Sequence, residues 1–353
     1  MSIPWLLKII SGRKTGPLAA SIRGLLWCFT PLYRVGVWYR NGQYDTGLSK
    51  IESVPAKVIS IGNITTGGTG KTPMVIWVCN LLAEHNIPTG IVSRGYGAVE
   101  SELPNDEAME LHARLPNVPH QQDPNRVEAA NRCIEEHSVG AIVLDDGFQH
   151  RRLDRNLDIV LIDASNPFGH GYLIPRGLLR EPAHALKRAD VVVITRCDRV
   201  DEKRIKEVNR QIQRATRSPI VLGKTMPMTL VDSSGTQSPL SDLKNGKGLV
   251  FSAIGNHEAF EASVTDEGCN VVGTMQFRDH HIYKVSDHDA LSAKASQCSA
   301  DFFVCTHKDL VKLQPDLLDL PVFALQTELQ IFEGEETLRS KILELFAPLK
   351  TLE

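Results

Sequence analysis

The sequence has few cysteines, and none has the paired spacing that builds a thiolate metal site. Its seven cysteines are scattered along the chain without a Cys-x-x-Cys pair. An odd, dispersed set argues against a disulfide framework and against a structural zinc site. We therefore expect a protein of a reducing compartment.

The chain also lacks a long apolar run and a strong net charge. The longest N-terminal apolar stretch, GLLWCFTPL at 24–32, falls well short of the ~20 residues that cross a bilayer. The formal net charge is −3 over 353 residues, so we expect no nucleic-acid partner. With 42% hydrophobic and 23% charged residues, the composition is that of a globular protein long enough for two domains.

Acidic residues are missing from the first 44 positions, which form a basic and apolar N-terminal segment. Six basic residues occur there: Lys8, Arg13, Lys14, Arg23, Arg34 and Arg40. Trp5, Leu6 and Leu7 are among the apolar residues between them. This pattern predicts an amphipathic segment at a membrane surface, with cations facing anionic lipid. The alternative is a helix packed on the protein's own core.

Beyond residue 55, short apolar runs alternate with helical patterns, which predicts a parallel sheet covered by helices. The expected strands are 57–62, 89–93, 140–145, 157–163, 190–195, 249–253, 271–275 and 302–306. The expected helices are 70–85, 125–137, 257–265, 287–296 and 335–346. We predict an α/β fold with a P-loop NTPase-type domain at 45–230, a smaller α/β domain at 231–353, and the N-terminal membrane-associating segment at 1–44. The boundary falls in the Ser/Gly/Asn-rich interval 231–248.

Residues 60–74, SIGNITTGGTGKTPM, have the strand–loop–helix context of a phosphate-binding loop. Gly67, Gly68 and Gly70 would let backbone N–H groups converge on phosphate oxygens at a helix N-terminus. Lys71 would reach the β- and γ-phosphates, and the Thr72 hydroxyl would bind Mg²⁺.

Residues 141–146, AIVLDD, form an apolar run that ends in two carboxylates, as a Walker B strand does. One of Asp145 and Asp146 would hold Mg²⁺, and the other would act on the acceptor or on the geometry of the site. The alternative is that the pair caps the next element. The segment TRCD at 195–198 lacks the Asn and Lys of a guanine-binding element, so we favour ATP over GTP.

Further motifs accompany this loop and point to one family. They are SRGYG (93–97), NDEAMEL (105–111), NRVEAA (125–130), LDDGFQHRRLDR (144–155), LIPRGLLREP (173–182), FSAIGN (251–256), DHHIY (279–283) and THKD (306–309). In this order, and over nearly the whole chain, the sequence resembles the tetraacyldisaccharide 4′-kinase family of lipid A biosynthesis. Thr65, where the general motif has glycine, follows the pattern of that family. The chain departs from it at Asn105, His257 and His307.

The resemblance implies a reaction and a location. The γ-phosphoryl group of ATP would pass to the 4′-hydroxyl of a tetraacylated glucosamine disaccharide 1-phosphate, giving the lipid A precursor lipid IVA. The enzyme would be peripheral, at the cytoplasmic face of the inner membrane, without an obligate protein partner. Its active site would lie in a cleft between two α/β domains. The competing hypothesis is a membrane-associated P-loop ATPase switch of the partitioning kind, although Thr66 stands where that class has a signature lysine.

The resemblance also assigns roles to residues. Asp106 matches the base that takes the hydroxyl proton, and His280 matches its histidine partner; Lys71, Asp145 and Asp146 complete the catalytic set. Residues assigned to the nucleotide are Thr65, Thr66, Gly67, Gly68, Thr69, Gly70, Lys71, Thr72, Arg126 and Gln149. Those assigned to Mg²⁺ are Thr72, Asp145, Asp146 and Glu181. Arg180 and Glu181 would lie at the rim of the cleft.

Overall fold

The computed structural model describes residues 3–95, 106–279 and 281–347, and it divides into two compact units. The first unit comprises Met1–Arg94, Asn117–Lys224 and Leu329–Glu353, and the second comprises Gly95–Pro116 and Thr225–Glu328. Two long strands, β7 (Ile220–Asp232) and β12 (Val322–Glu333), carry the chain from one unit to the other. The bounds 1–44, 45–230 and 231–353 for separate domains stay a prediction.

The first unit is built on a parallel sheet with the strand order β7-β6-β5-β1-β4-β2-β3. Its strands, besides β7, are β1 (Lys57–Asn63), β2 (Thr89–Ser93), β3 (His120–Gln122), β4 (Ala141–Asp145), β5 (Leu157–Asp163) and β6 (Val191–Thr195). In the centre, Ile59 of β1 pairs with Val143 of β4 and Leu157 of β5. Strands buried on both faces require continuous apolar sequences, which is why the apolar runs predicted these strands. The predicted α/β class is confirmed.

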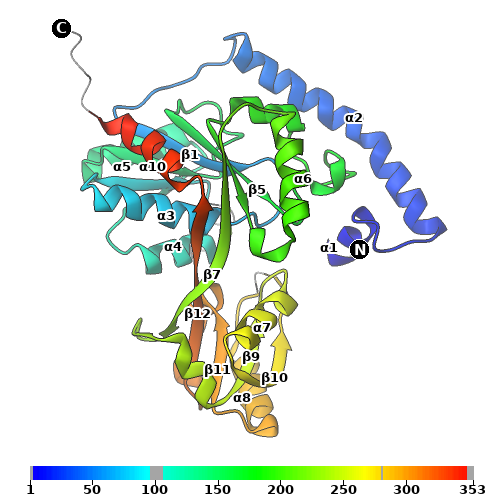
Figure 1. The fold of residues 1–353 in the computed structure, drawn as a ribbon, viewed down its shortest axis with the longest axis vertical. Coiled ribbons are helices and arrows are strands. Elements are labelled where there is room, and N and C mark those ends of the chain that lie inside the picture. The colour runs from blue at the N-terminus through cyan, green and yellow to red at the C-terminus, as the bar shows by residue number, and fades with distance from the viewer. Residues whose placement is uncertain (1–2, 96–105, 280, 348–353) are drawn as a thin grey trace. The chain divides into compact units, whose positions relative to one another are not determined.

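Helices cover this sheet (Figure 1). They are α3 (Lys71–Glu84), α5 (Arg126–His137), α6 (Glu202–Gln213) and α10 (Glu335–Leu343), with 3-10 turns at Gly169–Gly171, Ala183–Arg188, Cys197–Arg199 and Glu344–Phe346. The Asp201 side chain caps α6 by accepting from the backbone N–H of Arg204 at 2.7 Å. The carboxyl ends of β1 and β4 carry the glycine-rich loop and the paired aspartates, so one edge of the sheet receives both motifs.

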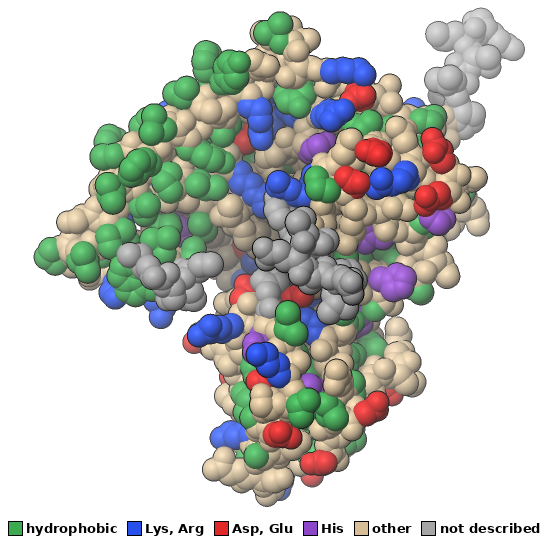
Figure 2. Space-filling model, turned by 180° about the vertical axis from the view of Figure 1, so that it is seen from behind, with side chains coloured by type: hydrophobic (Ala, Val, Ile, Leu, Met, Phe, Trp, Pro, Cys, Tyr) green, Lys and Arg blue, Asp and Glu red, His purple; other side chains and the backbone are tan. Residues whose placement is uncertain are grey.

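The N-terminal segment forms two helices, α1 (Ile3–Ile10) and α2 (Pro17–Asp45). On α2, Leu18, Leu25, Leu32 and Tyr39 are all exposed and recur every seven residues, so they form one apolar stripe. Figure 2 shows hydrophobic side chains gathered over this part of the surface. Among the described residues, no helix combines the length and the apolar character needed to cross a membrane.

The second unit contains the parallel strand order β10-β9-β11-β12, with β9 (Lys247–Ser252), β10 (Asn270–Gln276) and β11 (Phe302–Thr306). Its helices are α4 (Asp106–Arg114), α7 (His257–Asp266), α8 (Val285–Cys298) and α9 (His307–Leu310). A short strand β8 (Gln237–Ser238) and 3-10 turns at Leu240–Asn245 and Pro315–Leu317 complete it. Phe251 is fully buried and makes edge-on contacts with Phe277, Tyr283 and Phe303.

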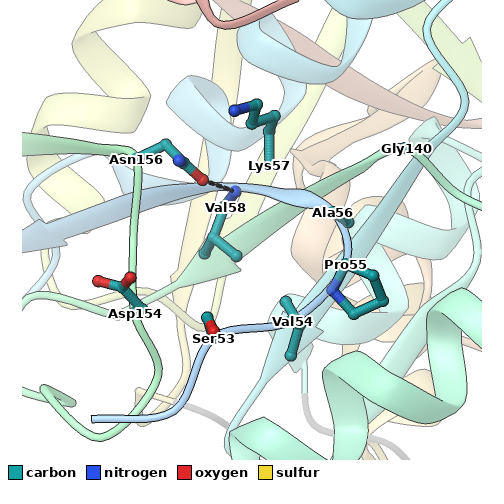
Figure 3. A pocket seen from close by; sticks show the side chains of 9 residues that line it. All are labelled: Ser53, Val54, Pro55, Ala56, Lys57, Val58, Gly140, Asp154 and Asn156. Atoms are coloured by element: carbon teal, nitrogen blue, oxygen red, sulfur yellow. Dashed lines mark hydrogen bonds between the residues drawn. The ribbon is translucent and has the colours of Figure 1, made fainter.

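A cavity of about 430 Å³ lies at the amino ends of β1 and β4, as Figure 3 shows. There the Asn156 side chain accepts a hydrogen bond of 2.8 Å from the backbone N–H of Val58. Lys57, the first residue of β1, is exposed at this end. The glycine-rich loop follows the last residue of the same strand, so Lys57 lies at the end of β1 opposite to the loop.

Candidate active site

The glycine-rich loop has the backbone of a phosphate cradle. Gly67 has a φ of 107° and Gly70 a φ of 86°, both in the left-handed region that glycine adopts without strain. Gly70 directly precedes α3, so the N-terminus of that helix opens onto the loop. Free N–H groups at a helix N-terminus attract phosphate. The loop therefore has the form that binds a nucleotide's phosphates.

Buried threonines fix the loop in place. Thr69 is buried; its hydroxyl accepts from the Asn63 amide at 2.9 Å, and its carbonyl accepts from the Thr195 hydroxyl at 2.8 Å. Thr65 is buried too and forms an isolated bridge with Leu179. Thr65 thus has its own packing place, which a glycine would leave unfilled. The sequence predicted no role for Asn63 or Thr195.

The Walker B segment reaches the loop because Gly62 has no side chain. A Cβ at Gly62 would lie 2.6 Å from the Cβ of Phe148, so only glycine permits this close approach. Asp146 itself has a φ of 53°. Its Oδ1 lies 3.6 Å from the Nζ of Lys71, whose side chain is 11% exposed. The predicted lysine and aspartate are therefore brought together.

Arg180 completes this charged cluster. Its Nη1 donates to both oxygens of Asp146, at 2.9 and 2.8 Å, and to Oε1 of Gln149 at 3.3 Å. Gln149 in turn donates to the Asn63 carbonyl at 2.9 Å. Burial alone would raise the pKa of Asp146, but Lys71 and Arg180 outweigh it and hold that pKa below its ordinary value. Asp146 is thus held as a carboxylate between two cations.

Arg126, the first residue of α5, adds positive charge to the same region. It is buried, and its Nη1 donates to the Pro124 carbonyl at 3.2 Å. Its charge contributes to the lowered pKa of Asp146. It also contributes, after burial, to lowering the pKa of His150 to about 4, which keeps that ring neutral at pH 7. Arg126 and Gln149, both predicted to serve the nucleotide, therefore lie within electrostatic or hydrogen-bonding range of this cluster.

The oxygen ligands expected for Mg²⁺ lie at the ends of the same two elements. Thr72 is buried in the first turn of α3, and Asp145 is the buried last residue of β4. A hydroxyl and carboxylates are the hard oxygen donors that Mg²⁺ takes in phosphoryl-transfer sites. The residues present fit that ion.

Glu181 has a different environment from the other predicted metal ligands. It is fully buried, and its carboxylate accepts from Arg188 at 3.0 Å and from the Asn41 amide at 2.8 Å, with Arg40 at 3.5 Å. These contacts attach α2 to the residue that follows Arg180. The sequence did not predict these partners of Glu181, because Arg188, Asn41 and Arg40 all lie on other elements. A metal-binding role for Glu181 stays a prediction.

The predicted base lies on the second unit. Asp106 is the first residue of α4, and its Oδ2 accepts from the Nζ of Lys312 at 3.1 Å. Lys312 is only 7% exposed and also lies 3.8 Å from Asp309 Oδ1. Asp309 is fully buried and accepts from the Tyr283 hydroxyl at 3.0 Å and the Ala253 N–H at 3.1 Å. The structure thus adds Lys312, which follows the THKD motif, to the surroundings of Asp106.

His280 and residues 96–105 lie outside the described residues, so the predicted Asp106–His280 pair stays a prediction. The neighbouring His281 is described. Its Nε2 lies 2.9 Å from Asp287 Oδ2, and its ring stacks on Phe277 with the centroids 5.0 Å apart. These contacts hold the ring of His281 between Asp287 and Phe277.

Comparison with known proteins places this geometry in one family. A family model described as "Tetraacyldisaccharide-1-P 4'-kinase" matches residues 22–347. The chain is 36% identical to the tetraacyldisaccharide 4'-kinase of Halothermothrix orenii, over 86% of this chain and 87% of that relative. It is 34% identical to that of Syntrophus aciditrophicus, with coverages of 91% and 92%. It is similar to LpxK from Aquifex aeolicus, solved in complex with ATP, with a TM-score of 0.76, 29% identity and coverages of 92% and 100%. The chain belongs to the tetraacyldisaccharide-1-P 4'-kinase family.

Proposed function

We propose that this protein transfers the γ-phosphoryl group of ATP to the 4′-hydroxyl of a tetraacylated glucosamine disaccharide 1-phosphate, forming lipid IVA. The cluster of Lys71, Asp146 and Arg180 beside the glycine-rich loop is the observation that carries the proposal. Family membership supplies the class of acceptor. The competing hypothesis of an ATPase switch does not explain the family match, and it gives the Asp106–Lys312 pair no role.

Phosphoryl transfer depends on positioning and on stabilising negative charge that spreads over phosphate oxygens. The loop's N–H groups hold the β- and γ-phosphates, and Lys71 places its ammonium against them. Thr72, Asp145 and Asp146 would hold Mg²⁺, which neutralises charge on the β- and γ-oxygens when bound. Arg180 fixes the carboxylate of Asp146 through both of its oxygens. Each of these groups is set in place before substrate arrives, so little reorganisation is needed.

We assign the removal of the 4′-hydroxyl proton to Asp106, with His280 as its partner. A carboxylate can accept that proton only in its ionised form. The ammonium of Lys312, 3.1 Å from Oδ2 of Asp106, favours the ionised form and limits how the side chain can rotate. Asp309 holds Lys312 from the buried side.

The direct test is incubation of the full chain with ATP, Mg²⁺ and the disaccharide 1-phosphate acceptor in detergent micelles. We expect stoichiometric ADP and a product phosphorylated at the 4′ position, identified by mass spectrometry and phosphorus NMR. Omitting Mg²⁺, with a chelator present, should abolish the transfer. ATP hydrolysis without a phosphorylated lipid would instead favour the ATPase switch.

We further propose that α2 holds the enzyme against the cytoplasmic face of the inner membrane, where its lipid acceptor lies. Its exposed stripe includes Leu32, at 69% exposure, and Trp38 next to the stripe is 73% exposed. Such apolar surface on a monomer marks an interaction site. Basic residues on the same segment would face anionic headgroups.

Replacing two leucines of this stripe should weaken membrane binding. For Leu25→Ser/Leu32→Ser we expect vesicle affinity to fall at least ~10-fold, because each buried leucine contributes about 1.5–3 kcal/mol. Co-sedimentation with vesicles of phosphatidylcholine and phosphatidylglycerol measures it. The control is Leu48→Ser/Ile51→Ser, which removes two exposed apolar residues beyond the end of α2. Equal losses in both variants would contradict the assignment to α2.

A further inference from the structure

A second cavity, of about 730 Å³, lies on the first unit beside the N-terminal helices. One wall is the end of α1 and the turn after it, the second is the 165–171 loop with Leu178, and the third is α6. Its volume falls within the roughly 300–1,000 Å³ of pockets that take small molecules. Neither the phosphate cradle nor the proposed base lines it, so the function proposed above leaves it unused.

The walls of this cavity are firmly attached to the unit. Ile9 and Ile10 of α1 are buried, and Arg176 donates to the Ile10 carbonyl at 3.2 Å. The loop is closed on itself by the bond of 2.9 Å from the Leu178 N–H to the Gly169 carbonyl. The Leu178 carbonyl accepts from the N–H of Thr66 at 2.7 Å. The cavity is therefore preformed, and one wall is bonded directly to the phosphate-binding loop.

The charge of the lining has one sign. Lys8, Arg13 and Arg204 line the cavity, and no Asp or Glu side chain is among its described lining residues. The guanidinium of Arg204 also forms an ion pair with the carboxylate of Glu207 on the same helix, with Nη1 2.7 Å from Oε2. Burial lowers the pKa of His170, and the positive charges of Arg176 and Arg13 lower it further. The net positive charge of the lining therefore comes from Lys8 and Arg13 on the wall formed by α1 and the turn after it, while Arg204 adds a guanidinium donor on the α6 wall.

The remaining lining is mixed. Ser11, Asn166 and Gln211 bring hydroxyl and amide groups, while Leu7 and Phe168 bring apolar surface. Leu7 is 42% exposed and lies on α1, which packs against α2. Hydrogen-bond donors beside cations suit a phosphate, and the neighbouring apolar surface suits the start of a lipid chain.

We propose that this cavity binds the phosphorylated headgroup of a lipid at the membrane surface. Two lipids offer that chemistry: the acceptor, through its 1-phosphate, and a bulk anionic phospholipid, through its phosphodiester. The acceptor alternative rests on the proposed function, whereas the phospholipid alternative does not. In either case the cavity holds a lipid headgroup next to the loop that holds ATP.

The test uses the full chain carrying Arg13→Gln/Arg204→Gln, which removes one cation from each of two walls. Its matched control, Lys203→Gln/Arg210→Gln, removes two exposed cations of α6 that do not line the cavity. The first arm measures equilibrium binding of the acceptor in neutral micelles, with and without its 1-phosphate. The second measures co-sedimentation with vesicles of phosphatidylcholine alone or mixed equally with phosphatidylglycerol.

If the acceptor's phosphate is the ligand, the cavity variant binds the phosphorylated acceptor at least about tenfold more weakly, because it lacks two of the cations that attract the phosphate. It then binds the acceptor without the 1-phosphate as the unsubstituted protein does. If a bulk phospholipid is the ligand, the loss appears on mixed vesicles and exceeds that of the control variant. Either result supports the cavity as a headgroup site.

The proposal is overturned if the cavity variant matches the control variant in both arms. Unchanged ATP affinity and unchanged melting temperature show that the variant is folded. Both arms measure binding rather than turnover. Failure of the unsubstituted protein to phosphorylate the acceptor would therefore contradict the proposed reaction. The binding results would still decide whether the cavity holds a lipid headgroup.

Discussion

Replacing Lys71 by methionine is expected to lower kcat for lipid phosphorylation at least ~10²-fold, because the transition state loses a fixed positive charge. Lys71 is nearly buried at the start of α3, with its ammonium 3.6 Å from Asp146. Methionine keeps the length and apolar stem of the side chain, so packing changes little. The measurement is steady-state transfer from radiolabelled ATP to the acceptor in micelles.

Removing Lys71 should leave the fold intact, which separates a chemical from a structural effect. Asp146 keeps its two hydrogen bonds to Arg180, so no buried carboxylate is left unpaired. Lys57→Met is the matched control, since Lys57 lies on the same strand–loop–helix unit but at the opposite end of β1. Turnover within a few-fold of normal in Lys71→Met would contradict the assignment of Lys71 to the phosphates.

Much of the first unit could be predicted, because its central strands are buried on both faces. The predicted strands 89–93 and 157–163 coincide with β2 and β5. Parallel strands covered by helices on both sides need unbroken apolar runs, and such runs can be recognised in a single sequence. Glycines and a lysine before a helix likewise identify the phosphate loop from local spacing alone.

The two strands that join the units, β7 and β12, were not predicted. Much of β7 is only half-buried, and it contains Lys224 and Pro227, residues that are uncommon in central strands. β12 likewise alternates between buried and exposed positions near its end. Polar residues therefore interrupt both strands, and no continuous apolar run spans either of them.

Partners distant in the sequence were the other part that local patterns did not reveal. Arg180 contacts Asp146 across 34 positions, and Lys312 contacts Asp106 across 206. Nothing in the local sequence pairs these two cations with those carboxylates, and only the fold brings each cation against its partner. The apolar stripe of α2 could be predicted only in part. Its apolar composition is apparent in the sequence, but the seven-residue spacing defines one face only because residues 17–45 form one continuous helix.

Asp106→Asn is the second substitution with a large expected effect, a fall in kcat of at least ~10²-fold through loss of base assistance. Asparagine has the same shape but cannot take up the hydroxyl proton. The adjacent Glu107→Gln is the control, since Glu107 lies on the same first turn of α4 and contacts Lys308 at 3.7 Å. Near-normal turnover in Asp106→Asn would refute the base assignment while leaving the kinase assignment in place.

Lys312→Met distinguishes a positioned base from a purely structural acid. Without the ammonium 3.1 Å away, the protonated form of Asp106 becomes more favourable, so the acid limb of the kcat/KM–pH profile should move to higher pH. At pH values well above that limb the variant should recover much of its rate, which a misfolded or merely mispacked enzyme would not do. Lys294→Met, at a half-buried lysine on α8 whose ammonium donates to Oε1 of Gln297 at 3.5 Å, should leave the profile unchanged. A uniform loss of rate at every pH in Lys312→Met would show that this lysine supports the fold and does not tune the base.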